Sequence, residues 1–129
     1  MPCEKYNGNM YSTEFRVPKM IEESSFSTSN PDSANFFLVK HYSTCHYHEC
    51  LSTLTESEKP EVCKKRTETY VREILRFIKQ EYPYWNITPA NHLLIFSWDL
   101  ASGILGSDKA IREEIRDAIH LTTLGSVSF

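Results

Sequence analysis

Histidine and cysteine side chains gather in one short stretch of the chain. The set comprises His41, Cys45, His46, His48 and Cys50. These are ligand types that zinc favours, and they lie close enough in sequence for several to reach one ion. Their spacing matches no recognised zinc finger. The chain has four cysteines, an even number, so disulfides, free thiols and a metal all stay open at this point.

A single carboxylate, Asp99, directly follows the apolar run that begins at His92. Acids at the carboxyl ends of parallel strands face the crevice where α/β sheets bind their ligands. We therefore regard Asp99 as a candidate functional residue. The alternative is that it caps the turn after the strand or pairs with a cation.

Three short apolar runs predict the strands that would position these residues. They extend from Phe36 to Tyr42, from His92 to Trp98 and from His120 to Leu124. The first is nearly unbroken, as expected of a strand that is covered on both faces of a parallel sheet.

Helices are predicted between the strands. The most regular pattern covers residues 61–81, where apolar side chains recur every three or four positions. An earlier helix is predicted from Ser12 or Thr13, either of which can cap it, to about Ser24, while Pro18 favours a start near Val17 or a kink. Its expected apolar stripe comprises Phe15, Val17, Met20 and Ile21. A third begins after Ser107 and Asp108. Residues 43–60 show no sustained period and are predicted to form a long surface loop carrying the histidines and cysteines.

This order of elements predicts an α/β fold, with a Rossmann-like parallel sheet flanked by helices and connected by right-handed crossovers. The length of 129 residues and the 40% apolar content suit one domain. A net charge of −3 argues against a nucleic-acid partner. The longest apolar run is only strand-sized, so we expect no membrane span in this chain.

Several motifs resemble the exostosin family of glycosyltransferases (family 47). The segment Tyr-Pro-Tyr-Trp-Asn-Ile-Thr at residues 82–88 precedes the run His-Leu-Leu-Ile-Phe-Ser-Trp-Asp at 92–99. Upstream, Tyr-Ser-Thr-Glu at 11–14 is similar to the family's Tyr-x-Thr-Glu helix start. Residues 30–39 are similar to its proline-acidic entry to a strand. Two positions depart from the family pattern, since Asn91 replaces an acid and residues 99–103 replace a tighter Asp-x-Gly turn.

The resemblance implies that residues 1–129 are a single partial domain, the N-terminal, acceptor-side lobe of a two-lobed GT-B glycosyltransferase. The sheet is expected to be cut at both ends, and the donor-binding lobe to be missing. A full-length enzyme would transfer a hexosyl or pentosyl group from a UDP-sugar to a glycan or polysaccharide acceptor with inversion. It would be anchored in the Golgi membrane, with this lobe on the lumenal side. No cofactor is expected in this chain, and the chain alone is expected to be inactive.

The resemblance also suggests roles for particular residues. Asp99 is the candidate catalytic base, because inversion needs a base near the acceptor hydroxyl. Tyr84, Trp85 and His92 are candidate acceptor-binding residues. For the aromatic pair the alternative is the closure of a helix–strand corner, and for His92 it is a buried boundary residue.

Two modifications fit a lumenal enzyme. A disulfide from Cys45 or Cys50 to Cys63 would tie the long loop to the main helix, and this is favoured over free thiols and over a metal. Asn86-Ile87-Thr88 is an acceptor sequence for N-glycosylation, although Pro89 reduces its efficiency.

Two other functions remain open at this stage. The chain can be a catalytically inactive glycan- or protein-binding module with the same fold. It can also be a metal-binding domain organised by the histidines and cysteines, in which case a chelator would unfold it.

Overall fold

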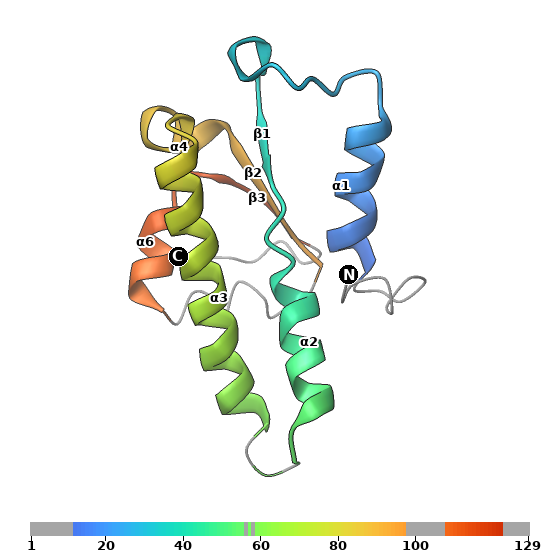
Figure 1. The fold of residues 1–129 in the computed structure, drawn as a ribbon, viewed down its shortest axis with the longest axis vertical. Coiled ribbons are helices and arrows are strands. Elements are labelled where there is room, and N and C mark those ends of the chain that lie inside the picture. The colour runs from blue at the N-terminus through green and yellow to red at the C-terminus, as the bar shows by residue number, and fades with distance from the viewer. Residues whose placement is uncertain (1–11, 56, 58, 98–107, 123–129) are drawn as a thin grey trace.

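The computed structural model describes residues 12–55, 57, 59–97 and 108–122. Its centre is a three-stranded parallel sheet in the order β1 (Phe37–Val39), β2 (His92–Phe96) and β3 (Ile119–Thr122). Val39 pairs with Leu94, and Leu94 pairs in turn with His120. The predicted α/β class and the parallel sheet are confirmed, with each strand shorter than its apolar run (Figure 1).

Helices flank this sheet. They are α1 (Thr13–Glu23), α2 (Ser43–Thr53), α3 (Lys59–Glu81), the short α4 (Tyr84–Ile87) and α6 (Lys109–Ile115), with 3-10 turns at Pro31–Ser33 and Pro89–Asn91. In Figure 1, α1 lies on one side of the strands and α3 and α6 lie on the other. Below the sheet, α2 and α3 run side by side in opposite directions.

The main core forms where α3, α4 and α6 pack on the sheet. Its buried members are Val39, Val71, Leu75, Trp85, Leu94, Phe96, Ile111 and Ile115. Val71 and Leu75 come from successive turns of α3, which confirms the helix that the three-and-four spacing predicts. Pro83 cannot continue the backbone bonding of α3, and the helix ends at Glu81. Asp108 caps α6 by accepting the N–H of Ile111 at 3.1 Å.

The bounds expected for α1 are confirmed, because the helix begins at Thr13 and ends at Glu23. Its buried face is not the expected one: the helix runs through Pro18, and its buried side chains are Glu14 and Pro18 instead of an apolar stripe. Met20, which was expected on that stripe, is 68% exposed. Pro18 removes one N–H near the start of the helix, and the other intrahelical bonds are sufficient to continue it.

The predicted loop at 43–60 is also wrong, because most of it is helix α2. Its buried residues include Ser43, Thr44, Cys45 and Tyr47. Small polar side chains and cysteines give little hydrophobic periodicity, so the pattern of this helix is nearly invisible in the sequence. What holds α2 is tertiary: it packs against α3, and Tyr47, Cys50 and Cys63 form a second small core.

Candidate functional site

Polar residues are buried together at the carboxyl end of the sheet. The first turn of α1 and the start of α2 both lie where β1 and β2 finish (Figure 1). The buried polar side chains contributed by these segments are Ser12, Glu14, His41, Ser43, Thr44 and Ser97. This is the edge at which α/β sheets bind their ligands, so it is the candidate functional site.

Glu14 is the centre of this group. Its side chain is 2% exposed, although a carboxylate is rarely buried without partners. Oε2 accepts the backbone N–H of Thr44 at 3.0 Å, and Oε1 accepts the hydroxyl of Ser43 at 3.3 Å. Tyr42, the N-cap residue of α2, offers no side-chain cap, so Glu14 from another helix satisfies the free backbone groups there.

His41 completes a buried pair with Glu14. Nδ1 of His41 lies 3.1 Å from Oε1 of Glu14 and also accepts the N–H of Ser43 at 3.2 Å. The ring lies against Phe96 of β2, with the two ring centroids 4.8 Å apart. The pair therefore links α1, the end of β1 and the start of α2.

Burial favours the neutral form of both partners. It raises the pKa of Glu14 from 4.5 to about 7, and hydrogen bonds from Thr44 and Ser43 oppose that rise. Burial lowers the pKa of His41 from 6.5 to about 4, offset in part by the Ile95 carbonyl. Because Nδ1 of His41 accepts the N–H of Ser43, this nitrogen carries no proton in the neutral ring. It can therefore also accept a hydrogen bond from a protonated Glu14. Between about pH 4 and about pH 7 both groups are neutral, and the proton of the Glu14 carboxyl faces Nδ1 of His41.

Tyr42 makes the turn between β1 and α2 with a left-handed backbone, φ 48° and ψ 34°. It is the only described residue other than glycine with a positive φ. This conformation costs about 1 kcal/mol or more for a residue with a Cβ, and such residues cluster at functional sites. It lets the chain pass from strand to helix within a few residues, so that His41, Ser43 and Thr44 all face the same buried edge.

Some buried polar atoms at this edge lack a protein partner. Within the described ranges, Oγ of Ser97 makes no hydrogen bond of normal geometry. Oγ1 of Thr44 and Nε2 of His41 make none either, although the Thr44 side chain lies near the Glu14 carboxyl and the His41 ring near the Ile95 carbonyl. Buried polar groups are nearly always paired, and the exceptions need a reason such as a bound water or a ligand.

The aromatic candidates from the sequence lie at the opposite end of the sheet. His92 is the first residue of β2, and its ring stacks on Phe37, the first residue of β1, at 5.0 Å. Phe37 also stacks on Tyr84 at 5.1 Å, and Trp85 meets His92 edge-on at 4.7 Å. These rings form one cluster at the amino ends of the strands.

The geometry gives Trp85 and His92 a structural role. Their exposed fractions are 2% and 3%, so neither ring offers a face to a sugar. Nε1 of Trp85 donates to Glu114 at 2.9 Å, and Nδ1 of His92 bonds the Thr88 carbonyl at 2.9 Å. Their role is the closure of a helix–strand corner, which was the alternative for the aromatic pair. Tyr84 is half-buried, with its hydroxyl 2.6 Å from Asp32.

Asp99 and Asn86 are the remaining candidates from the sequence. Asp99 lies outside the described residues, in the segment that follows Ser97. Asn86 is exposed on α4, and its Nδ2 donates to the Lys79 carbonyl at 3.5 Å. An exposed asparagine followed by Ile87 and Thr88 is accessible for glycosylation.

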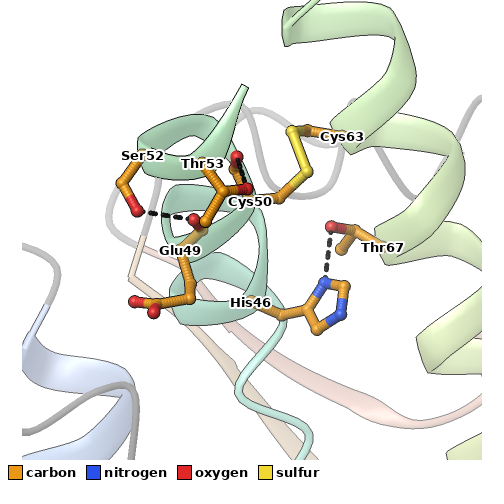
Figure 2. The surroundings of a disulfide bond; sticks show 7 residues. All are labelled: His46, Glu49, Cys50, Ser52, Thr53, Cys63 and Thr67. Atoms are coloured by element: carbon orange, nitrogen blue, oxygen red, sulfur yellow. Dashed lines mark hydrogen bonds between the residues drawn. A yellow bond between two sulfur atoms is a disulfide. The ribbon is translucent and has the colours of Figure 1, made fainter. Parts of the chain in front are cut away.

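Figure 2 shows the disulfide that joins Cys50 of α2 to Cys63 of α3, one of the two pairings the sequence left open. The Cα atoms are 5.5 Å apart. Beside it, Nδ1 of His46 and Oγ1 of Thr67 lie 3.0 Å apart and tie the same two helices together. Cys45 is in a disulfide as well.

These bonds bear on the metal hypothesis. Disulfide sulfurs are not the thiolates that zinc binds, and Cys45 and Cys50 are both oxidised. His46 stacks on Tyr70 with ring centroids 4.3 Å apart, so it contributes to helix packing. In the part of the chain that the structure describes, no three His, Cys, Asp or Glu side chains are arranged to hold a metal ion.

Sequence reasoning missed the central pair of the site. Glu14 entered only as the last residue of a motif, and His41 only as a member of the histidine and cysteine cluster. One signal was present. Glu14 and Pro18 are four residues apart, so they lie on the same face of a helix, and that face is the buried one. Its partner positions on α2 were hidden by the loop assignment.

Comparisons with known proteins show which family the chain matches. Residues 1–124 match the family described as "Exostosin GT47 domain". The chain is 30% identical over 118 residues to "Probable glucuronosyltransferase GUT1" of Oryza sativa subsp. japonica, covering 90% of this chain and 26% of that protein. It is 28% identical over 118 residues to "Probable glucuronosyltransferase 47 A" of Physcomitrium patens, covering 90% of this chain and 24% of that protein.

The chain thus spans about a quarter of the length of these curated relatives. No solved structure gives a significant match. Among the described residues, no helix is both long enough and apolar enough to cross a membrane.

Proposed function

This chain belongs to the exostosin GT47 family, and from that membership we propose that it is the acceptor-side lobe of a glycosyltransferase. In the proposed enzyme a second lobe binds the nucleotide-sugar donor, in a GT-B arrangement. The reaction takes place between the lobes, at the carboxyl end of the sheet described above. The observation that carries the proposal is the burial of six polar residues at that edge.

We propose a UDP-sugar as the donor, bound by the second lobe. Two relatives are named as glucuronosyltransferases, which makes UDP-glucuronic acid the first donor to test. The acceptor is a glycan or polysaccharide that lies against the carboxyl edge of the sheet, over the buried polar layer that contains Thr44, Ser97 and His41. Tyr84, partly exposed at the far end of the sheet, is a candidate contact for a long acceptor chain.

The transfer is a displacement with inversion. The acceptor hydroxyl attacks the anomeric carbon of the donor sugar, the bond to the UDP oxygen breaks, and UDP leaves with the electron pair. The hydroxyl proton passes to a base, for which we propose Asp99 because it is the first acid that follows β2 in the sequence. Correct placement of the two substrates contributes much of the rate.

We also propose a Golgi setting, with this lobe on the lumenal side. Two observations support it. The chain contains the Cys50–Cys63 disulfide, and disulfides persist mainly in oxidising compartments. The chain also carries an exposed glycosylation sequence at Asn86. The products would be polysaccharide or glycoprotein glycans.

The test uses the full-length protein that contains this chain. It is incubated with UDP-glucuronic acid, and then with other UDP-sugars, in the presence of an array of oligosaccharides, and release of UDP is measured. We expect turnover that depends on the acceptor, and a fall of about a hundredfold or more in kcat for Asp99→Asn. Asp117→Asn is the matched control, because Asp117 is an exposed acid on the loop before β3.

The result also separates the proposal from an inactive binding module. Binding of an oligosaccharide without turnover of any UDP-sugar would contradict the enzyme and favour that module. Turnover that Asp99→Asn leaves intact would contradict the role of Asp99 alone.

A further inference from the structure

We propose that Glu14 and His41 form a proton-sensitive positioning pair for the acceptor side of the site. While the pair holds its shared proton, it fixes the first turn of α1 against the β1–α2 turn and keeps Thr44 in place at the carboxyl edge. Loss of that proton loosens the arrangement and weakens acceptor binding. This inference rests on the proposed function, since it assigns a regulatory role within the same acceptor site.

The first support is geometric. The Glu14 carboxyl makes its contacts across three segments distant in sequence: it belongs to α1, and it touches His41 after β1 and Ser43 and Thr44 in α2. Both of its oxygens are used in this way, and it is 2% exposed. A carboxyl enclosed like this does not touch a substrate, so Glu14 acts through the residues that it holds.

The second support is the set of groups that face Glu14. From the β1–α2 segment these are His41 and Tyr42, and from α3 it is Tyr70. None of them is a cation at neutral pH: His41 is neutral, and burial raises the pKa of both tyrosines. Among the described residues, a negative charge on Glu14 therefore has no cation beside it to replace the proton, and burial makes the charge costly.

The third support is the position of Thr44. It gives its backbone N–H to Glu14, and its side chain is buried in the same polar group at the carboxyl edge. The start of α2, which shapes that edge, is thus held directly by the group that changes protonation. Movement of the α2 start by a fraction of an ångström is enough to weaken hydrogen bonds made at this edge, because their strength falls steeply with geometry.

The experiment has two readouts on the full chain. The ring ¹⁵N shifts of His41 are followed by NMR against pH, and the binding of the chain to an oligosaccharide array is measured at about pH 6 and about pH 8. Glu14→Gln is the test variant, since the amide keeps the shape of the protonated carboxyl and can donate to Nδ1. Glu22→Gln is the matched control, an exposed glutamate on the same helix that pairs with Lys40.

We expect the wild-type His41 shifts to show an inflection near pH 7, and the array binding to be stronger at the lower pH. Glu14→Gln should lose the inflection and bind equally at both values, while Glu22→Gln should behave as wild type. The absence of an inflection in the wild type overturns the proposal, as does a pH dependence of binding that survives in Glu14→Gln. If no oligosaccharide binds to the wild type at all, the proposed function fails, and the positioning role with it, while the inflection still reports the shared proton.

Discussion

Replacing Glu14 by Gln should stabilise the chain above neutral pH. The pKa of Glu14 is raised from 4.5 to about 7 by burial, so the folded state binds this proton more tightly than the unfolded state does. That contribution is fully present below pH 4.5 and is lost as the pH rises through about 7. At about 1.4 kcal/mol for each pH unit between the two values, the loss approaches about 3 kcal/mol.

The assay is urea unfolding of the wild type and of Glu14→Gln at about pH 5 and about pH 8. We expect the free energy of unfolding of the variant to rise by about 2 to 3 kcal/mol relative to the wild type between these values. His41 has the opposite dependence, because its lowered pKa costs stability as the pH falls from 6.5 toward about 4. Both proteins contain His41, so its effect cancels in the comparison.

Glu14→Ala tests the hydrogen bonds of Glu14 separately from its charge. It leaves the N–H of Thr44 and the Ser43 hydroxyl without their partner, and it should be less stable than Glu14→Gln by about 2 kcal/mol or more at either pH. The reasoning is refuted if the difference between the wild type and Glu14→Gln does not change with pH. It is also refuted if Glu14→Ala is as stable as Glu14→Gln.

Three further predictions follow from other contacts. Replacing both Cys50 and Cys63 by Ala should lower the free energy of unfolding by about 3 kcal/mol, measured by urea titration in non-reducing buffer. Equal stability would show that the disulfide between α2 and α3 does not stabilise the fold. Asp108→Ala should lower the free energy of unfolding by about 1 kcal/mol because it removes the N-cap of α6, whereas Asp108→Asn, which can still cap, should lower it less. The reverse order would contradict the capping role of Asp108. In secretory expression Asn86→Gln should reduce the apparent mass on a gel by one glycan, and an unchanged mass before and after glycosidase treatment would show that the site is not used.

The sheet and the longest helix were predictable because their signals are strong and local. Unbroken apolar runs gave β1 and β2, and the three-and-four spacing around Val71 and Leu75 gave α3. Helix α2 was missed because its stability comes from contacts with distant segments, namely Glu14 at its start and Cys63 at its end. No local pattern records either contact.

The site was harder to predict than the fold. A strand end and its acid were recognised, but burying Glu14 beside His41 depends on how α1 crosses the sheet, which the sequence alone does not specify. For Trp85 and His92 the residue types suggested sugar contacts, while burial at the amino end of the sheet makes them part of the packing. Aromatic residues serve both purposes, and only their exposure distinguishes the two.

The most direct test of an acceptor site at the carboxyl edge is an NMR titration of the ¹⁵N-labelled chain with an oligosaccharide selected on the array. The account predicts that the largest amide shifts fall on residues around the Glu14 pair, His41 and Thr44, and on Ser97. Phe37 and His92, at the other end of the same strands, should change little. Shifts centred on Phe37 and His92 would contradict the proposed location of the site.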